Sequence, residues 1–169
     1  MNVLFHLTVG IGIATILTDT KKTSPEAKLT DTLKIEISAF IVGIISHGAL
    51  DYIPHCYPIN SRVDVILGLA FIIVLTLLAN NKYKGIIGLT LIGCIFPDLV
   101  DLSPAIINKN LGFNLPILDK VFPWHWHVYS GSIYNYSCGV STINHLLVIV
   151  AVGIVCWYRR ADFSNLFLN

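Results

Sequence analysis

Residues 37–55, ISAFIVGIISHGALDYIPH, form an apolar run that ends in two histidines and an aspartate. Acidic, basic and imidazole side chains are absent from residues 38–50 except at His47. His47 and Asp51 are four residues apart and therefore share one face of a helix, and His55 follows a proline that ends or bends that helix. Histidine and carboxylate side chains are common ligands of divalent metals. Because ionisable groups are costly inside a membrane, the stretch predicts a membrane-spanning helix with a functional site at its end.

The composition of the whole chain predicts a single integral membrane domain over residues 1–169. The chain is 54% hydrophobic and 12% charged, whereas soluble domains carry about 25% charged residues. A net charge of +1 without a basic patch gives no indication of a nucleic-acid partner. The first apolar run lacks a basic n-region and a small-residue cleavage site, so we interpret it as a retained helix.

Five apolar segments predict an all-α polytopic protein with about five short transmembrane helices. They are residues 2–18, 35–53, 63–79, 84–100 and 143–158. At 1.5 Å per residue such helices span about 24–29 Å, close to the ~30 Å of a hydrocarbon core. The long connection at residues 101–142 is rich in Pro, Gly, Asn, Ser and aromatic residues, and we predict an ordered cap there.

The basic residues are distributed unevenly between the two sides that five spans define. One side holds Lys21, Lys22, Lys28, Lys34, Lys82, Lys84, Arg159 and Arg160, and the other holds Arg62, Lys109 and Lys120. Cytoplasmic loops carry the excess of Lys and Arg. The sequence therefore predicts that the N-terminus is outside and the C-terminus is cytoplasmic.

The same topology gathers the histidines at the outer end of the spans. The candidates for metal ligands there are His6, His47, Asp51, His55, Asp98, His125 and His127. Asp101 and Asp64 lie at the same end and are candidates for a general base. We interpret His145, at the start of the last span, as a structural residue.

Four of these candidates form two pairs. Asp98 and Asp101 are three residues apart on one helix face, where a divalent cation would remove their repulsion; the alternative is a solvated helix end. In an extended segment, His125 and His127 would point the same way, toward a site; the alternative is an aromatic belt at the membrane surface. His6 and Asp64 stand alone, and each is either a functional group or a satisfied polar residue.

The four cysteines form no metal-ligand pattern. Cys94 and Cys156 fall inside apolar runs and are interpreted as small hydrophobic residues. Cys56 and Cys138 fall in connections, where they either remain thiols or pair in an oxidising compartment.

These motifs resemble those of the YdjM-like family of bacterial inner-membrane proteins, which are described as membrane-bound metal-dependent hydrolases. The matching pieces are His6, the Ser-His-x3-Asp stretch at residues 46–51, the Pro-Asp-x2-Asp stretch at residues 97–101, and the His-x-His pair at residues 125–127. The resemblance implies a location in the bacterial inner membrane and a metal-dependent hydrolytic activity.

Two functions remain open from the sequence. In the first, one or two divalent ions, with zinc as the expected metal, activate water against an ester or phosphoester of a lipid-linked or amphiphilic substrate at the outer membrane face. In the second, the chain is a non-catalytic membrane subunit or scaffold with a structural metal or a His/Asp hydrogen-bonded site. An enzyme needs an open metal position, whereas four protein ligands close a structural site.

Overall fold

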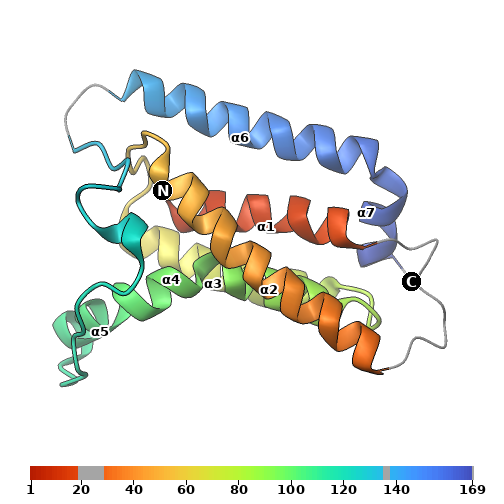
Figure 1. The fold of residues 1–169 in the computed structure, drawn as a ribbon, viewed down its shortest axis with the longest axis horizontal. Helices are drawn as coiled ribbons and strands as arrows, with labels where there is room; N and C mark the ends of the chain where they lie inside the picture. The colour runs from red at the N-terminus through yellow and green to blue at the C-terminus, as the bar shows by residue number, and fades with distance from the viewer. Residues whose placement is uncertain (19–28, 135–137, 169) are drawn as a thin grey trace.

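The computed structural model describes residues 1–18, 29–134 and 138–168, and within them the chain is all-α with seven α-helices (Figure 1). The helices are α1 (Val3–Leu17), α2 (Leu29–Tyr52), α3 (Ser61–Leu78), α4 (Lys84–Asp101), α5 (Ser103–Leu111), α6 (Gly139–Tyr158) and α7 (Arg160–Phe167). Each predicted apolar segment is confirmed as a helix. The predicted cap contains α5 and a 3-10 helix, η1 (Pro123–His125). Lys21, Lys22 and Lys28, which entered the charge count, lie outside the described residues.

Helix α1 is the centre of the bundle. It contacts α2, α3, α4, α6 and α7, and Figure 1 shows α6 along one side of it with α2 and α4 on the other. Its side chain Leu7 is fully buried in a core with Ile87 and Leu91 of α4. This central position places the first residues of α1 beside the C-terminal ends of α2 and α4.

Glycines allow α2 and α4 to touch backbone to backbone. A Cβ at Gly93 would lie 2.3 Å from the carbonyl oxygen of Phe40, and one at Gly43 would lie 2.8 Å from that of Thr90. Only residues without a side chain permit such an approach. The contact lies about one helical turn before His47, so it brings the functional end of α2 against the end of α4.

In the part of the chain that the structure describes, three helices are long and apolar enough to cross a membrane: residues Thr32–Tyr52 of α2, then α3 and α6. Helices α4 and α5 together pass the same test as a fourth span, bent by 64° between them. Large apolar side chains such as Ile66, Leu77 and Ile154 are more than 60% exposed on α3 and α6, which suits contact with lipid. Helix α1 has 15 residues and is shorter than these, so the five-span topology stays a prediction.

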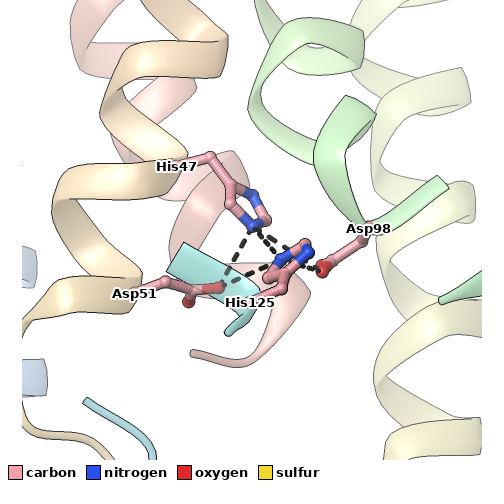
Figure 2. A group of neighbouring side chains, drawn as sticks. All are labelled: His47, Asp51, Asp98 and His125. Carbon is pink, nitrogen blue, oxygen red and sulfur yellow. Dashed lines mark hydrogen bonds and ion pairs between the residues drawn. The ribbon is translucent and has the colours of Figure 1, made fainter. Parts of the chain in front are cut away.

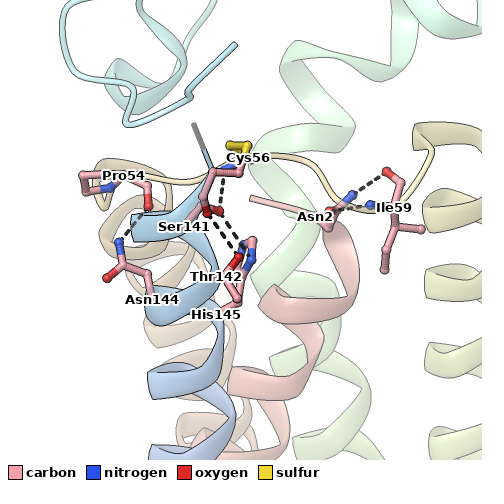
Figure 3. Close-up of a disulfide and its surroundings, with 9 residues drawn as sticks. Asn2, Pro54, Cys56, Ile59, Ser141, Thr142, Asn144 and His145 are labelled. Carbon is pink, nitrogen blue, oxygen red and sulfur yellow. Dashed lines mark hydrogen bonds between the residues drawn. A yellow bond between two sulfur atoms is a disulfide. The ribbon is translucent and has the colours of Figure 1, made fainter. Parts of the chain in front are cut away.

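A disulfide and several hydrogen bonds hold the cap to the end of the bundle. Cys56 and Cys138 form the disulfide, with their Cα atoms 5.9 Å apart, which resolves the alternative that the sequence left open (Figure 3). On α6, the hydroxyl of Ser141 accepts from the backbone N–H of Cys56 at 2.7 Å. In the cap, the N–H of Gly131 donates to the carbonyl of Asp51 at 2.7 Å. The segment after α2 is therefore fixed from both sides.

Candidate metal centre

Four side chains from three separate segments converge at this end of the bundle (Figure 2). They are His47 and Asp51 from the last turns of α2, Asp98 from the last turn of α4, and His125 from η1. One ligand atom from each lies within 4.8 Å of all the others. His47, Asp51 and His125 are buried and Asp98 is half-buried, so the group could hold a metal ion away from bulk water.

Five of the six distances between these atoms are close to those of tetrahedral coordination, and the sixth, between Asp51 and Asp98, is within 4.8 Å. The His47 Nε2 atom lies 3.2 Å from Asp51 Oδ2 and 3.6 Å from Asp98 Oδ1. The His125 Nε2 atom lies 3.4 Å from Asp51 Oδ2, 3.3 Å from Asp98 Oδ1 and 3.3 Å from His47 Nε2. Ligands about 2.0–2.1 Å from a tetrahedral zinc are separated from one another by about 3.3–3.4 Å. The side chains are thus spaced as they would be around one ion.

The other ring nitrogens fix which nitrogen faces the centre. The His47 Nδ1 atom donates to the backbone carbonyl of Cys94 at 2.7 Å, and the His125 Nδ1 atom donates to Asp101 Oδ2 at 2.8 Å. Each imidazole therefore carries its proton on Nδ1 when neutral and turns the lone pair of Nε2 inward. Two such lone pairs 3.3 Å apart repel each other unless a proton or a metal ion lies between them. This arrangement is the clearest indication that the residues fit a cation.

The electrostatics of the centre also favour a positive charge. Burial by itself would lower the pKa of His125, but hydrogen bonds with Asp51, Asp98 and Asp101 outweigh it and raise the pKa to about 10. Without a metal, a proton on His125 therefore balances part of the carboxylate charge at neutral pH. A divalent ion would have to displace that proton.

Local packing explains why only one histidine of the His-x-His pair reaches the centre. The segment is not extended, as the prediction required, but turns into a 3-10 helix at Pro123–His125. Consequently His125 is buried in the cluster, whereas His127 is exposed. The turn is seated by Trp124, whose ring packs where a side chain at Gly48 would be, since a Cβ there would lie 2.6 Å from Trp124 Cε3.

Two predicted ligands lie beside the cluster, on the other oxygen of Asp51. His6 stacks on the ring of His47 with centroids 3.9 Å apart, and its Nε2 atom lies 3.2 Å from Asp51 Oδ1. His55 Nε2 lies 3.9 Å from the same oxygen. His145 lies outside the group and stacks on Phe5.

The two predicted bases have other hydrogen-bonding roles. Asp101 accepts from the backbone N–H groups of Val121 and Phe122 at 2.9 and 3.0 Å, in addition to its bond with His125. These bonds tie the cap to the end of α4 and orient the His125 ring. A catalytic role for Asp101 stays a prediction.

Asp64 lies at the start of α3 and holds the start of α1. It accepts from the side chain of Asn2 at 3.1 Å and from the backbone N–H groups of Val3 and Leu4 at 2.7 and 3.2 Å. An acidic side chain at a helix N-terminus satisfies N–H groups that have no partner within the helix. A catalytic role for Asp64 likewise stays a prediction.

A cavity of about 570 Å³ opens beside the cluster, and Asp51, Asp98 and His125 form part of its wall. Its apolar wall comes mainly from α3, α4, α5 and the residue that joins the last two, and it includes Val65, Leu69, Ile95, Leu99, Leu102, Ile106 and Ile107. Its polar wall comes from the cap and from the segment after α2 and includes Tyr57, Lys120, His127, Ser130, Ser132 and Tyr134. A cavity of this size and mixed lining suits a small amphiphilic molecule.

A short chain of hydroxyl groups in this wall has no signature in the sequence. The Tyr57 hydroxyl lies 2.7 Å from Ser132 Oγ, and Ser132 Oγ lies 3.2 Å from His55 Nε2. Burial raises the pKa of Tyr57 to about 12, so the phenol stays protonated. These residues meet because the backbones at His55 and Ser132 form a parallel bridge, a long-range pairing that no local pattern indicates.

Comparison with known proteins finds no matching family model, no matching curated protein and no matching solved structure. The resemblance to the YdjM-like family therefore stays a prediction.

Proposed function

We propose that this chain is a membrane-embedded metal-dependent hydrolase that cleaves an ester or phosphoester of a lipid-linked or amphiphilic substrate. A zinc ion held by His47, Asp51, Asp98 and His125 is the expected cofactor. The observation that carries the proposal is a buried four-donor cluster with tetrahedral spacing in the wall of a largely apolar cavity. The motifs shared with the YdjM-like family agree with this activity.

The proposed topology has five spans in a bacterial inner membrane, with the N-terminus and the site outside. The charge asymmetry of the sequence supports it, because Lys82, Lys84 and Arg159 lie at the ends of helices opposite the site. The disulfide supports it as well, because Cys56 lies one residue from His55 at the site end, and disulfides persist in oxidising compartments.

When bound, a divalent ion supplies Lewis-acid chemistry that acidifies water and polarises a carbonyl or phosphoryl oxygen. His47 and His125 keep their Nε2 lone pairs on the centre because Cys94 and Asp101 hold their Nδ1 protons. Asp98 has a side chain that is 20% exposed, against 8% for Asp51, so it is the carboxylate that water and substrate reach. Asp98 would therefore be the ligand that a substrate oxygen displaces from the ion, and once released its carboxylate could accept a proton from water.

The cavity positions an amphiphilic substrate across the centre. Apolar side chains such as Leu69, Leu99 and Ile106 would cover its hydrocarbon part. Lys120 lies at the polar side of the cavity, and its ammonium group donates to the backbone carbonyl of His125 at 2.7 Å. An ammonium group at this position attracts a phosphate, which favours an anionic phosphoester over a neutral ester.

One observation favours the second candidate function, a structural metal in a non-catalytic membrane protein. The cluster supplies four protein ligands at tetrahedral spacing, which is typical of closed structural sites. Against it, three of the four ligands border the cavity, so a substrate oxygen could add to the ion or replace Asp98. The two candidates therefore differ in catalysis, and both require a metal.

The test uses the full chain purified in phospholipid nanodiscs. We expect stoichiometric zinc in the wild type, its loss in His47→Ala, and hydrolysis of a fluorescent anionic phospholipid that disappears on chelation and in Asp98→Asn. The His145→Ala variant is the matched control, because His145 is a buried histidine at the same end of the bundle outside the cluster. Tightly held zinc without hydrolysis of phosphoester or ester amphiphiles would instead identify the structural alternative. A wild-type protein that binds no metal would refute both.

A further inference from the structure

The side of Asp51 that faces away from the four-donor cluster has a ligand arrangement of its own. Asp51 turns Oδ2 toward His47 and His125, and it turns Oδ1 toward His6 and His55. The distances to Oδ1 are 3.2 Å from His6 Nε2 and 3.9 Å from His55 Nε2. A carboxylate with two imidazoles at each oxygen has the arrangement of a group that bridges two metal ions.

His6 provides an independent indication of a missing ligand. It is completely buried, and among the residues that the structure describes its ring has one polar contact, the 3.2 Å approach of Nε2 to Asp51 Oδ1, while Nδ1 has no partner. Leaving a buried polar group unsatisfied is unfavourable. Because His6 Nε2 faces Asp51 Oδ1, a cation bound at this oxygen would also meet the lone pair of a His6 ring that carries its proton on Nδ1.

His55 is prepared for the same ion. Its Nδ1 atom donates to the backbone carbonyl of Ile53 at 2.7 Å, so a neutral ring presents the lone pair of Nε2 to the space beside Asp51 Oδ1, which lies 3.9 Å away. The backbone around His55 is fixed by hydrogen bonds with Gly131 and Ile133 and by the adjacent disulfide. The ammonium group of Met1 fills this space, 2.7 Å from His55 Nε2 and paired with Asp51 Oδ1, so it stands where a cation would bind and an ion would have to displace it.

From this geometry we propose a second divalent metal site, held by His6, His55 and Asp51 Oδ1, so that Asp51 bridges two ions. The proposal rests on the proposed function and makes it a two-metal hydrolysis, in which paired ions stabilise both the attacking and the leaving oxygen of a phosphoester. The second site adjoins the cavity, since Met1 and Asp51 line it beside Tyr57 and Ser132. The hydroxyl groups of Tyr57 and Ser132, both 3.2 Å from His55 Nε2, would then lie next to the substrate.

The experiment measures zinc per chain by mass spectrometry in nanodiscs after equilibration with free zinc and removal of the excess. We expect two ions in the wild type and in the His145→Ala control, and one ion in His6→Ala and in His55→Ala. One ion in the wild type, unchanged in both variants, would overturn the second site and leave the proposed function intact. No bound ion in the wild type would overturn both.

A spectroscopic measurement on the wild-type chain tests the second site even if the variants fail to fold. With manganese in place of zinc, two ions that share a carboxylate lie about 3.5–4 Å apart, and their electron spins couple. We expect a coupled paramagnetic resonance spectrum at saturating manganese. An uncoupled spectrum of a single ion at saturation would overturn the proposal.

Discussion

Replacement of Asp101 by Asn tests whether this carboxylate positions a ligand or acts as a base. Asp101 Oδ2 accepts from His125 Nδ1 at 2.8 Å and from the N–H of Phe122 at 3.0 Å, while Oδ1 accepts from the N–H of Val121 at 2.9 Å. An asparagine has one acceptor oxygen, so its amide group must face an N–H on one side. At least one of the three bonds is lost in either orientation of the amide.

The size of the effect follows from the role of the bond. Removing the hydrogen-bond partner of a metal-binding histidine weakens metal binding about 10- to 100-fold, which is about 1.4–2.7 kcal/mol. Asp101→Asn also removes a charge that helps to hold the inward lone pair of His125 in place. We therefore expect zinc affinity to fall by this factor, with hydrolysis restored in part by excess zinc.

The assay is a zinc competition titration against a chromophoric chelator, with wild-type protein and Asp101→Asn in nanodiscs. Asp119→Asn is the matched control, since it removes the same charge from an exposed position in the same cap. An affinity within twofold of wild type, combined with loss of hydrolysis that excess zinc does not restore, would refute the positioning role. That result would identify Asp101 as the base that the sequence predicted.

Three further predictions concern the same end of the molecule. Zinc affinity should rise about tenfold per pH unit between pH 7 and pH 10. The reason is that the pKa of His125 is raised to about 10, so this side chain must release a proton before it can bind zinc. Calorimetry in buffers of different ionisation enthalpy should show about one proton released per zinc bound at pH 7. Gly48→Ala should weaken zinc binding in the same titration, because the added Cβ would lie 2.6 Å from the Trp124 ring and would displace it. Gly153→Ala is the control and should leave zinc binding unchanged, since no atom lies within 4 Å of a Cβ added there. Reduction of the Cys56–Cys138 disulfide should lower the free energy of unfolding by about 2–4 kcal/mol, measured by denaturant titration. An unchanged free energy of unfolding would show that the disulfide does not stabilise the fold.

The helices could be predicted from the sequence because their signal is local. Apolar runs give the five main helices to within a few residues, except that α2 begins at Leu29 rather than at residue 35. The start of α2 is polar, so hydropathy does not detect it. Helix α7 and the short helices of the cap were missed for the same reason, since their residues are mixed in polarity.

The ligands could be predicted as a group but not individually. Helical spacing placed His47 and Asp51 on one face, and the alternation of spans placed Asp98 at the same end. Whether His125 or His127 joined them depended on a 3-10 turn seated by tertiary contact with α2. An extended segment and a turn point their side chains differently, and the sequence of the cap does not choose between them.

Several apolar helices, with the histidines near one end of them, can be read from the residues alone, because hydropathy and helical periodicity are properties of neighbouring residues. Which donors meet depends on how the helices and the cap pack together. His47 and His125 are 78 residues apart and lie 3.3 Å from each other at Nε2, and Cys56 pairs with a cysteine 82 residues away. The tertiary structure also decides that the two oxygens of Asp51 face different histidines, since that depends on how α1, α2 and the cap pack around one carboxylate.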